Sequence, residues 1–284
     1  MGEISFTKMQ GAGNDFILVR EEGLPRALGS EIGDLARKIC DRRFGIGADG
    51  LMMASCKRDG IQMRYCNADG SPAAVCGNGL RCFARYASEQ QLVKEDRFVV
   101  QTDAGAKAVE LLRDAAGAIC GAQVEIGRPE LLPYEIPALL PGSRIIDSPL
   151  NVSGLSLRVS CLKVGVPHAV VFWEQSPTEK QLCGIGRAVE HHPAFPEGIN
   201  FDIAVPAGKD TFRIFTWERG AGHTLACGTG CCAAAAAARL SKRSDAAQIR
   251  LIAEGGTLTV KIEEDGNLLL SGGAQKICSG TFLF

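Results

Sequence analysis

The chain has 284 residues, of which 46% are hydrophobic and 22% charged, so it can form about two globular domains. Its 31 basic and 32 acidic residues give a net charge of -1, which argues against a nucleic-acid or anionic-membrane partner. No apolar run approaches the ~18 residues that span a bilayer. The first ten residues also lack the pattern of a signal peptide, so we expect a cytoplasmic protein.

Predicted strands and helices alternate along the whole chain. Runs with alternating or β-branched apolar residues predict strands at 4–9, 16–20, 51–55, 61–65, 97–102, 106–113, 119–126, 156–164, 168–173, 201–205, 211–218, 248–253, 257–263 and 267–272. Apolar spacing and alanine content predict helices at 30–40, 80–88, 177–191 and 231–240. Many strands with few helices indicate an α+β protein.

The sequence contains an internal repeat. Cys76-Gly-Asn-Gly reappears as Cys227-Gly-Thr-Gly, shifted by 151 residues. Gly45-Ile-Gly-Ala-Asp resembles Gly198-Ile-Asn-Phe-Asp, and Lys8-Met resembles Lys163-Val, shifted by 153 and 155 residues. We infer two similar domains, 1–128 and 129–272, and expect the last strand, about 273–284, to complete the first domain.

A cysteine before Gly-x-Gly at the start of a helix suggests anion chemistry. Free backbone N–H groups and the helix dipole there stabilise a thiolate or a bound carboxylate. Two such cysteines in a duplicated fold can face one ligand from opposite sides. A thiolate can then remove a proton from carbon while a thiol delivers one to the other face.

Three segments carry a family resemblance: Phe6 to Phe16, Asn67 to Cys82, and Glu218 to Gly230. Together they resemble the diaminopimelate epimerase family. The resemblance implies two pseudo-symmetric α+β domains, each a barrel-like mixed sheet around a central helix, with the active site in the cleft between them. It also implies a homodimer, and cofactor-independent and metal-free conversion of the small-molecule substrate LL-2,6-diaminoheptanedioate to its meso form, for lysine and peptidoglycan synthesis.

The same resemblance assigns roles to individual residues. It makes Cys76 and Cys227 the acid/base pair, with His168 and Glu218 tuning the thiols. Backbone N–H groups of Gly77, Asn78, Gly228 and Thr229 would hold the reacting carboxylate. The rest of the substrate would be bound by Asn14, Asn67, Asn200, Glu218 and Arg219, which offer amide donors, a cation and an anion to a second amino acid head group.

Three positions depart from the family pattern. Val166 stands where Asn is frequent, Gly50 where some members carry Gln, and His223 where Glu is common. They leave open a racemase of another amino acid, of histidine or proline type, that also works without pyridoxal phosphate. A non-catalytic amino acid binding protein or a thiol redox sensor would use the same cysteines differently.

Other motifs are weaker. Residues 45–50 match a dinucleotide-binding string but follow a predicted helix instead of a strand, so we reject that motif. The spacing of the cysteines does not fit a structural zinc site. We interpret the remaining cysteines as small buried hydrophobic residues: Cys40, Cys56, Cys66, Cys82, Cys120, Cys161, Cys183, Cys231, Cys232 and Cys278.

Overall fold

A computed structural model describes residues 2–24, 32–57 and 60–283. The chain divides into two compact units. Unit 1 comprises Met1–Glu125 with Gly272–Phe284, and unit 2 comprises Ile126–Ser271. From the sequence, these divisions are expected at residues 128/129 and 272/273.

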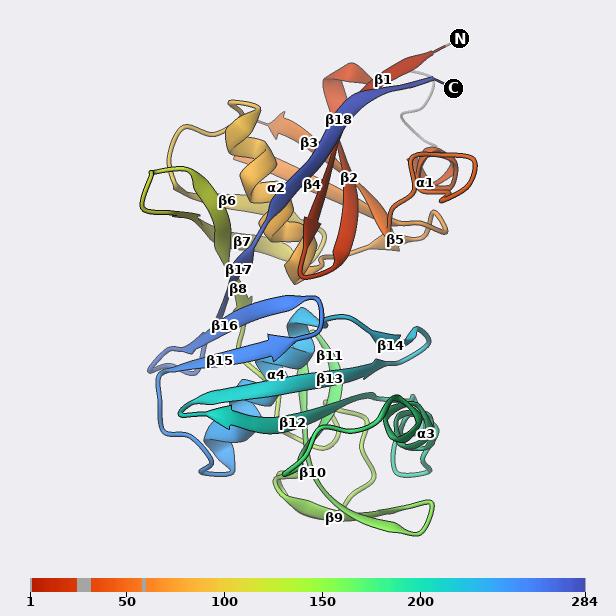
Figure 1. The fold of residues 1–284 in the computed structure, drawn as a ribbon, viewed down its shortest axis with the longest axis vertical. Coiled ribbons are helices and arrows are strands. Elements are labelled where there is room, and N and C mark those ends of the chain that lie inside the picture. Colours follow the sequence, from red (N-terminus) through yellow and green to blue (C-terminus); the bar gives the residue numbers. More distant parts are fainter. Residues whose placement is uncertain (1, 25–31, 58–59, 284) are drawn as a thin grey trace. The chain divides into compact units, whose positions relative to one another are not determined.

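Unit 1 is built from strands around one long helix (Figure 1). Strand β1 forms antiparallel pairs with β2 and with the last strand of the chain, while β2 runs parallel to β3. The elements are β1 (Glu3–Gly11), β2 (Asn14–Arg20), the 3-10 turn η1 (Glu21–Gly23), α1 (Ile32–Ile39), β3 (Gly50–Lys57), β4 (Gly60–Asn67), β5 (Pro72–Ala73), α2 (Gly77–Glu89), β6 (Arg97–Thr102), β7 (Gly105–Arg113), β8 (Ile119–Gly127) and β18 (Gln275–Leu283).

Unit 2 follows the same plan. Its elements are β9 (Ser148–Val152), β10 (Leu155–Val164), β11 (Val166–Phe172), α3 (Glu179–Glu190), β12 (Asn200–Gly208), β13 (Thr211–Glu218), β14 (Gly222–Thr224), α4 (Gly228–Leu240), β15 (Gln248–Ala253), β16 (Gly256–Ile262) and β17 (Leu268–Gly273). The β1–β2, β2–β3 and β3–β4 pairings of unit 1 recur as β10–β11, β11–β12 and β12–β13, with the same antiparallel, parallel, antiparallel order. The internal repeat in the sequence is therefore a repeat of topology. The match of 45–49 with 198–202 expected from the sequence is out of register by three residues, because the strand pairings make Gly50 equivalent to Asn200 and Met52 equivalent to Asp202.

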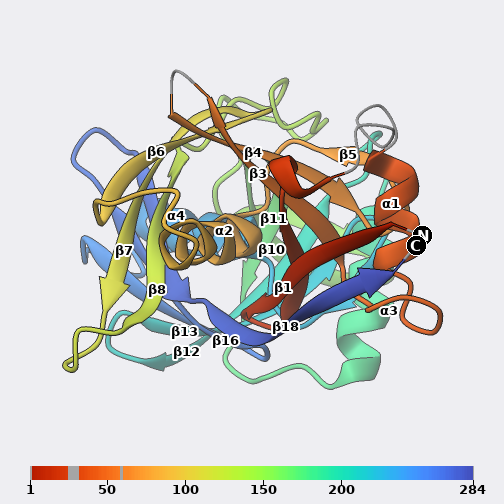
Figure 2. The same ribbon diagram turned by 90° about the horizontal axis from the view of Figure 1, so that it is seen from above.

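Each unit surrounds its long helix with strands. Helix α2 packs on β1, β2, β3 and β7, and α4 packs on β10, β11, β12 and β16; Figure 2 shows α2 end on, among the strands of its own unit. Every alanine from Ala233 to Ala238 is buried. Side chains this small let strands approach the helix from all sides, which confirms the interpretation of this run as a closely packed central helix.

Several details differ from the sequence predictions. Both Gly-x-Gly helices begin at the first glycine, so the preceding cysteines are their N-cap residues. The short strands β5 and β14 were missed, because two- and three-residue pairings give no periodic signal, and the five-residue strand β9 was also missed. The burial prediction was wrong for Cys56, Cys120 and Cys278, which are exposed at strand positions. The start of the predicted helix 30–40 lies outside the described residues.

Across the described ranges, no helix is long and apolar enough to cross a membrane. Within those same ranges, no cluster of His, Cys, Asp and Glu side chains has the arrangement of a metal site.

Candidate active site

Cys76 and Cys227 occupy the same structural position in the two units. Each is the extended residue directly before its central helix, with φ/ψ of -129°/124° at Cys76 and -109°/116° at Cys227. The N–H groups of the first helical turn have no partner within the helix and point toward this end. The N–H of Gly230 donates to Cys227 Sγ at 3.4 Å. The N-terminal end of α4 therefore holds the sulfur atom directly.

The surroundings of Cys227 oppose ionisation of its thiol. The side chain is buried, and burial together with the nearby Glu218 and Asp202 carboxylates raises the pKa of Cys227 well above its ordinary value. The Thr229 hydroxyl and the Gly230 N–H act in the opposite direction but do not outweigh burial. At rest, Cys227 is therefore a neutral thiol, which suits a proton donor.

A chain of hydrogen bonds leads from this thiol through the half-buried Thr229 to a buried histidine. Cys227 Sγ lies 3.2 Å from Thr229 Oγ1, which lies 3.0 Å from His168 Nε2. On its other side, His168 Nδ1 lies 2.7 Å from Asp202 Oδ2, and Thr216 Oγ1 donates to Asp202 Oδ1 at 2.8 Å. His168 and Asp202 are both fully buried. The structure thus brings together three of the predicted residues, Cys227, Thr229 and His168.

Glu218 approaches the same thiol from the end of β13. Burial raises the pKa of Glu218, and the Asp202 charge adds to this, while a hydrogen bond to Cys227 works against it. Thr224 Oγ1, on β14, donates to Glu218 Oε1 at 2.6 Å and fixes the carboxyl group. A carboxyl group held beside a thiol in a buried site can exchange a proton with it.

Asn200 and Arg219 lie next to one another, at the start of β12 and directly after β13. Asn200 is buried, donates to the Pro167 carbonyl at 2.8 Å and accepts from the Arg219 backbone N–H at 2.8 Å. The exposed Arg219 guanidinium donates to the Glu197 carbonyl at 2.8 Å. The Asn200 amide thus ties together the backbone segments that carry His168 and Arg219.

In unit 1, a network of side-chain hydrogen bonds lies at the start of α2. Asn78 Nδ2 donates to Asn14 Oδ1 at 2.6 Å, and Asn14 Nδ2 donates to Asp49 Oδ2 at 3.2 Å. The buried Arg81 guanidinium donates to Asn78 Oδ1 at 2.9 Å. These contacts bring Asn14 and Asn78 together, and Asn78 adjoins Gly77 and Cys76 in the chain.

Asn67 ends β4, where it lies opposite Gly50 and donates to Ser71 Oγ at 3.0 Å. Cys76 itself is half-buried. Burial raises the pKa of the Tyr65 phenol, two residues before Asn67, and a negative charge on Cys76 raises it further. Cys76 and the end of β4 are therefore electrostatic neighbours.

Sequence reasoning missed Asp202, Thr216, Thr224 and Asp49. Asp202 carried a usable signal, because it is a lone charge inside the apolar strand Asn200–Gly208, and an acidic residue is rarely buried without a partner. The two threonines carried no such signal, since Thr is common in strands.

The three departures from the family pattern have distinct local settings. A side chain at Gly50 would collide with the Tyr65 ring and the Cys66 carbonyl, so no Gln fits there without repacking. Val166 is exposed at the start of β11, next to the Gly165 turn. His223 Nε2 pairs with the carboxylate of Glu254, which lies in the turn between β15 and β16. This turn therefore supplies the acidic group near position 223.

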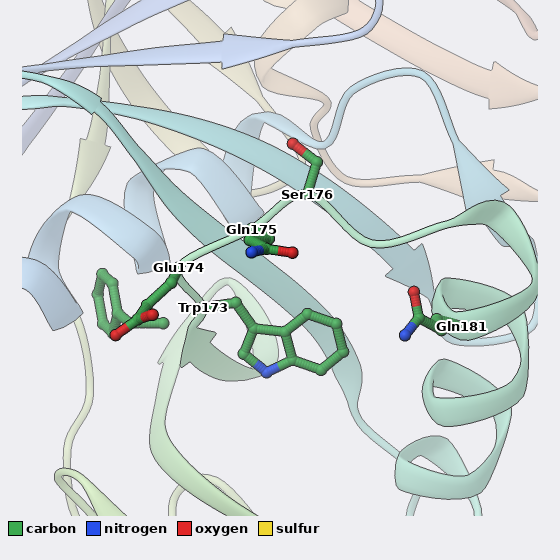
Figure 3. Close-up of a pocket in the computed structure, with 6 residues that line it drawn as sticks. Trp173, Glu174, Gln175, Ser176 and Gln181 are labelled. Atoms are coloured by element: carbon green, nitrogen blue, oxygen red, sulfur yellow. The ribbon is translucent and has the colours of Figure 1, made fainter.

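A separate surface hollow of about 430 Å³ lies in unit 2 at the end of β11. It is lined by Phe172, Trp173, Glu174, Gln175, Ser176 and Gln181. Figure 3 shows Trp173 to Ser176 along one stretch of chain, with Gln181 coming from the neighbouring helix α3. None of the predicted site residues lines this hollow, and it contains no nucleophilic thiol.

Comparison with known proteins places this architecture in a family. The family model described as diaminopimelate epimerase matches residues 6–132 and 160–277. The chain is 41% identical to a diaminopimelate epimerase of Clostridium perfringens over 284 residues, covering 99% of this chain and 100% of the relative. It is 38% identical to one of Moorella thermoacetica over 278 residues, covering 98% of each.

Among solved structures, the fold matches a phenazine biosynthesis protein of the PhzF family from Bacillus anthracis. That match has a TM-score of 0.70 with 13% identity and covers 100% of both chains. At this identity the likeness concerns the fold alone. The sequence matches carry the assignment, and the chain belongs to the diaminopimelate epimerase family.

Proposed function

We propose that this protein is a cofactor-independent epimerase that converts LL-2,6-diaminoheptanedioate to the meso form, with Cys76 and Cys227 as its acid and base. The observation that carries the proposal is the repeated N-cap cysteine. Each unit offers one thiol at the start of its central helix, in the same backbone conformation. Family membership at 41% identity over nearly the whole chain supports the substrate.

The reaction needs two groups on opposite faces of the α-carbon. One thiolate removes the α-proton while the other group, a neutral thiol, protonates the opposite face, and the roles exchange in the reverse direction. The raised pKa of Cys227 supports the thiol role for it at rest, and Glu218 and His168 are the groups beside it that can exchange its proton.

Two helix starts suit the reacting carboxylate. Removal of the α-proton places negative charge on the carbon and its carboxylate, which nearby N–H donors stabilise. The first-turn N–H groups of Gly77 and Asn78 in α2, and of Gly228 and Thr229 in α4, are such donors.

The second amino acid head group of the substrate carries a carboxylate and an ammonium group, so its binding site needs both a cation and an anion. Arg219 and the amides of Asn14, Asn67 and Asn200 can bind a carboxylate, and Glu218 can bind an ammonium group. At positions 50, 166 and 223 this chain has Gly, Val and His in place of side chains that some family members use. The competing proposal is therefore a racemase that acts on another amino acid.

The decisive experiment measures α-hydrogen exchange in deuterated water with the reduced protein. We expect deuterium uptake and inversion with diaminopimelate, and little with monocarboxylic amino acids. Equal turnover of histidine or proline would support a racemase of that substrate instead. Absence of exchange with every amino acid would leave the binding-protein and redox-sensor functions.

Single variants test the two-thiol mechanism. Cys76→Ala and Cys227→Ala are each expected to abolish inversion, because in each variant one face of the α-carbon lacks its proton-transfer group. Cys161→Ala, at a buried cysteine of the β10 core, is the matched control and should retain turnover. An intact rate in either single active-site variant refutes the two-base mechanism.

We further propose that the protein works in the cytoplasm as a homodimer and serves lysine and peptidoglycan synthesis. Its twelve free cysteines favour a reducing compartment. Exposed apolar side chains on β18, Ile277 and Leu283, support an interface between copies. Cell fractionation and light scattering test these two statements.

A further inference from the structure

The helices α1 and α3, which connect the parallel strands of the two units, share a two-residue pattern. Helix α1 lies between β2 and β3, and α3 lies between β11 and β12. In α1, Gly33 is followed four residues later by Arg37; in α3, Gly186 is followed four residues later by Glu190. Residues four apart lie on one face of a helix, so each glycine and its charged partner can contact the same neighbouring segment.

In unit 2, the neighbouring segment is the end of β13 and the turn that leads to β14. A side chain at Gly186 would collide with Trp217, so glycine allows the indole to lie directly on α3. The Glu190 carboxylate accepts from Trp217 Nε1 at 2.7 Å and from the Gly220 backbone N–H at 2.9 Å, one with each oxygen. The two residues between these donors are both proposed to bind the substrate.

In unit 1, the neighbouring segment is the turn between β4 and β5. A side chain at Gly33 would collide with the Gly70 carbonyl, so this helix also lies against the turn itself. Arg37 Nη1 donates to the Asp69 carbonyl at 3.0 Å. A charged side chain of the connecting helix therefore holds the backbone of a turn in each unit.

The two helices hold equivalent positions. Met52 and Asp202 are equivalent, because each would contact a side chain placed at the third residue of the central helix of its unit. Met52 pairs with Tyr65 on β4, and Asp202 pairs with Thr216 on β13. Counting onward from these partners gives two more equivalent pairs: Asp69 with Gly220, and Asn67 with Glu218.

Helix stability alone does not explain the carboxylate of Glu190. Glu190 is the last residue of α3, where the helix dipole favours a cation. Burial would raise the pKa of Glu190, and its side chain is only 11% exposed, but the hydrogen bonds from Trp217 and Gly220 outweigh burial and lower this pKa. The groups that Glu190 binds are therefore the reason for an anion at this end of α3.

We propose that Glu190 is a positioning residue for the epimerisation, which holds the turn after β13 so that Glu218 and Arg219 keep their places at the substrate. Arg37 is the corresponding positioning residue of unit 1 and holds the turn that follows Asn67. This inference rests on the proposed function and adds to it two residues that do not touch the substrate. Positioning matters because a displacement of about 1 Å can slow a reaction about 100-fold.

Glu190→Gln tests the contact in unit 2. One carboxylate oxygen becomes an NH2 group, which cannot accept from the N–H that it faces. We expect kcat to fall and KM for diaminopimelate to rise, with kcat/KM lowered about 10- to 100-fold, since Glu218 exchanges a proton and Arg219 binds a carboxylate. Partial unfolding lowers only the apparent kcat, so the raised KM distinguishes positioning from a merely structural role.

Glu179→Gln is the matched control, because it neutralises an exposed glutamate in the first turn of the same helix. We expect wild-type kcat and KM for it. Wild-type values for Glu190→Gln as well, or a lower kcat with an unchanged KM, overturn the inference.

Arg37→Met tests the contact in unit 1 and predicts a different kinetic effect. Asn67 is proposed to bind the substrate without transferring a proton, so we expect KM to rise about tenfold while kcat stays near the wild-type value. Lys38→Met removes the adjacent exposed cation of α1 and should leave both constants unchanged. An unchanged KM for Arg37→Met overturns the proposal for unit 1, and if Glu190→Gln does not fold, Arg37→Met decides.

Amide hydrogen exchange separates this inference from the proposed function, because it needs no substrate. We expect the Arg219 and Gly220 amides to exchange faster in Glu190→Gln than in the wild type or in Glu179→Gln, since the turn has lost an acceptor. Unchanged exchange overturns the inference even if the enzyme epimerises its substrate. Missing α-hydrogen exchange in the wild type refutes the proposed function and, with it, the role of Glu190 in epimerisation.

Discussion

Three glycine-to-alanine substitutions test how rigidly Asp202 is held. Gly230 of α4 faces the Asp202 carboxylate, Gly79 of α2 faces the end of the Met52 side chain, and Gly184 of α3 faces open space. All three lie in helices, so alanine brings the same type of gain in each, about 0.5–1 kcal/mol from lower chain entropy in the unfolded state.

The cost of the added methyl group differs between the three sites. At Gly230 the carboxylate is clamped by His168 and Thr216, so it cannot move without losing a hydrogen bond. Overpacking costs about 1–3 kcal/mol, and a hydrogen bond to a charged group contributes about 1.5–3 kcal/mol. At Gly79 the thioether end of Met52 can rotate away, and at Gly184 nothing has to move.

We therefore expect Gly230→Ala to lower the free energy of unfolding by about 1–3 kcal/mol, Gly79→Ala to change it by less than about 1 kcal/mol, and Gly184→Ala to raise it by about 0.5–1 kcal/mol. Denaturant unfolding of the three variants beside the wild type measures the order. If Gly230→Ala is as stable as Gly184→Ala, the Asp202 carboxylate is not clamped by His168 and Thr216.

Other consequences concern charge and capping. Burial raises the pKa of Glu218, so ionisation of this carboxyl group opposes folding as the pH rises above its unfolded-state pKa of about 4.3. Glu218→Gln should therefore be more stable than the wild type at pH 7 and equally stable near pH 4. Denaturant titrations at the two pH values measure this difference. Burial alone would raise the pKa of Asp15, but Arg42 and Lys8 outweigh it and lower the pKa, so Asp15→Asn should lose about 2 kcal/mol at neutral pH, a deficit that shrinks as pH falls below about 4. Thr178 caps α3 in a reciprocal pair with Gln181, so Thr178→Ala should cost about 1 kcal/mol in thermal or denaturant unfolding, and an unchanged midpoint would contradict this capping role.

The sequence carried the features that depend on local order. Within the described residues, alternating patterns located most long strands and apolar spacing located α1 and α3, because a half-buried element must place its apolar residues on one face. Helices α2 and α4 were located by their place after Cys-Gly-x-Gly and, for α4, by its alanines. The repeated Cys-Gly-x-Gly located the two helix starts, and glycine, which has no side chain, suits the crowding around Gly79 and Gly230. The family also followed from these motifs.

The tertiary structure decided which side chains meet. Asp202, Thr216 and His168 lie on three strands, and their contact depends on the parallel register of β11 with β12 and the antiparallel register of β12 with β13. Register comes from packing of the whole sheet, so no local pattern predicts it. The exposure of Cys56, Cys120 and Cys278 was decided in the same way.

The repeat separates the two levels most clearly. The sequence by itself determined that two similar units each present one cysteine at a helix start, because that feature lies within four consecutive residues. Only the tertiary structure decided that the layer beneath one helix is apolar and the layer beneath the other holds a buried His–Asp pair. The physical reason is that this difference arises between residues some 30 to 60 positions apart, which only the folded sheet brings into contact.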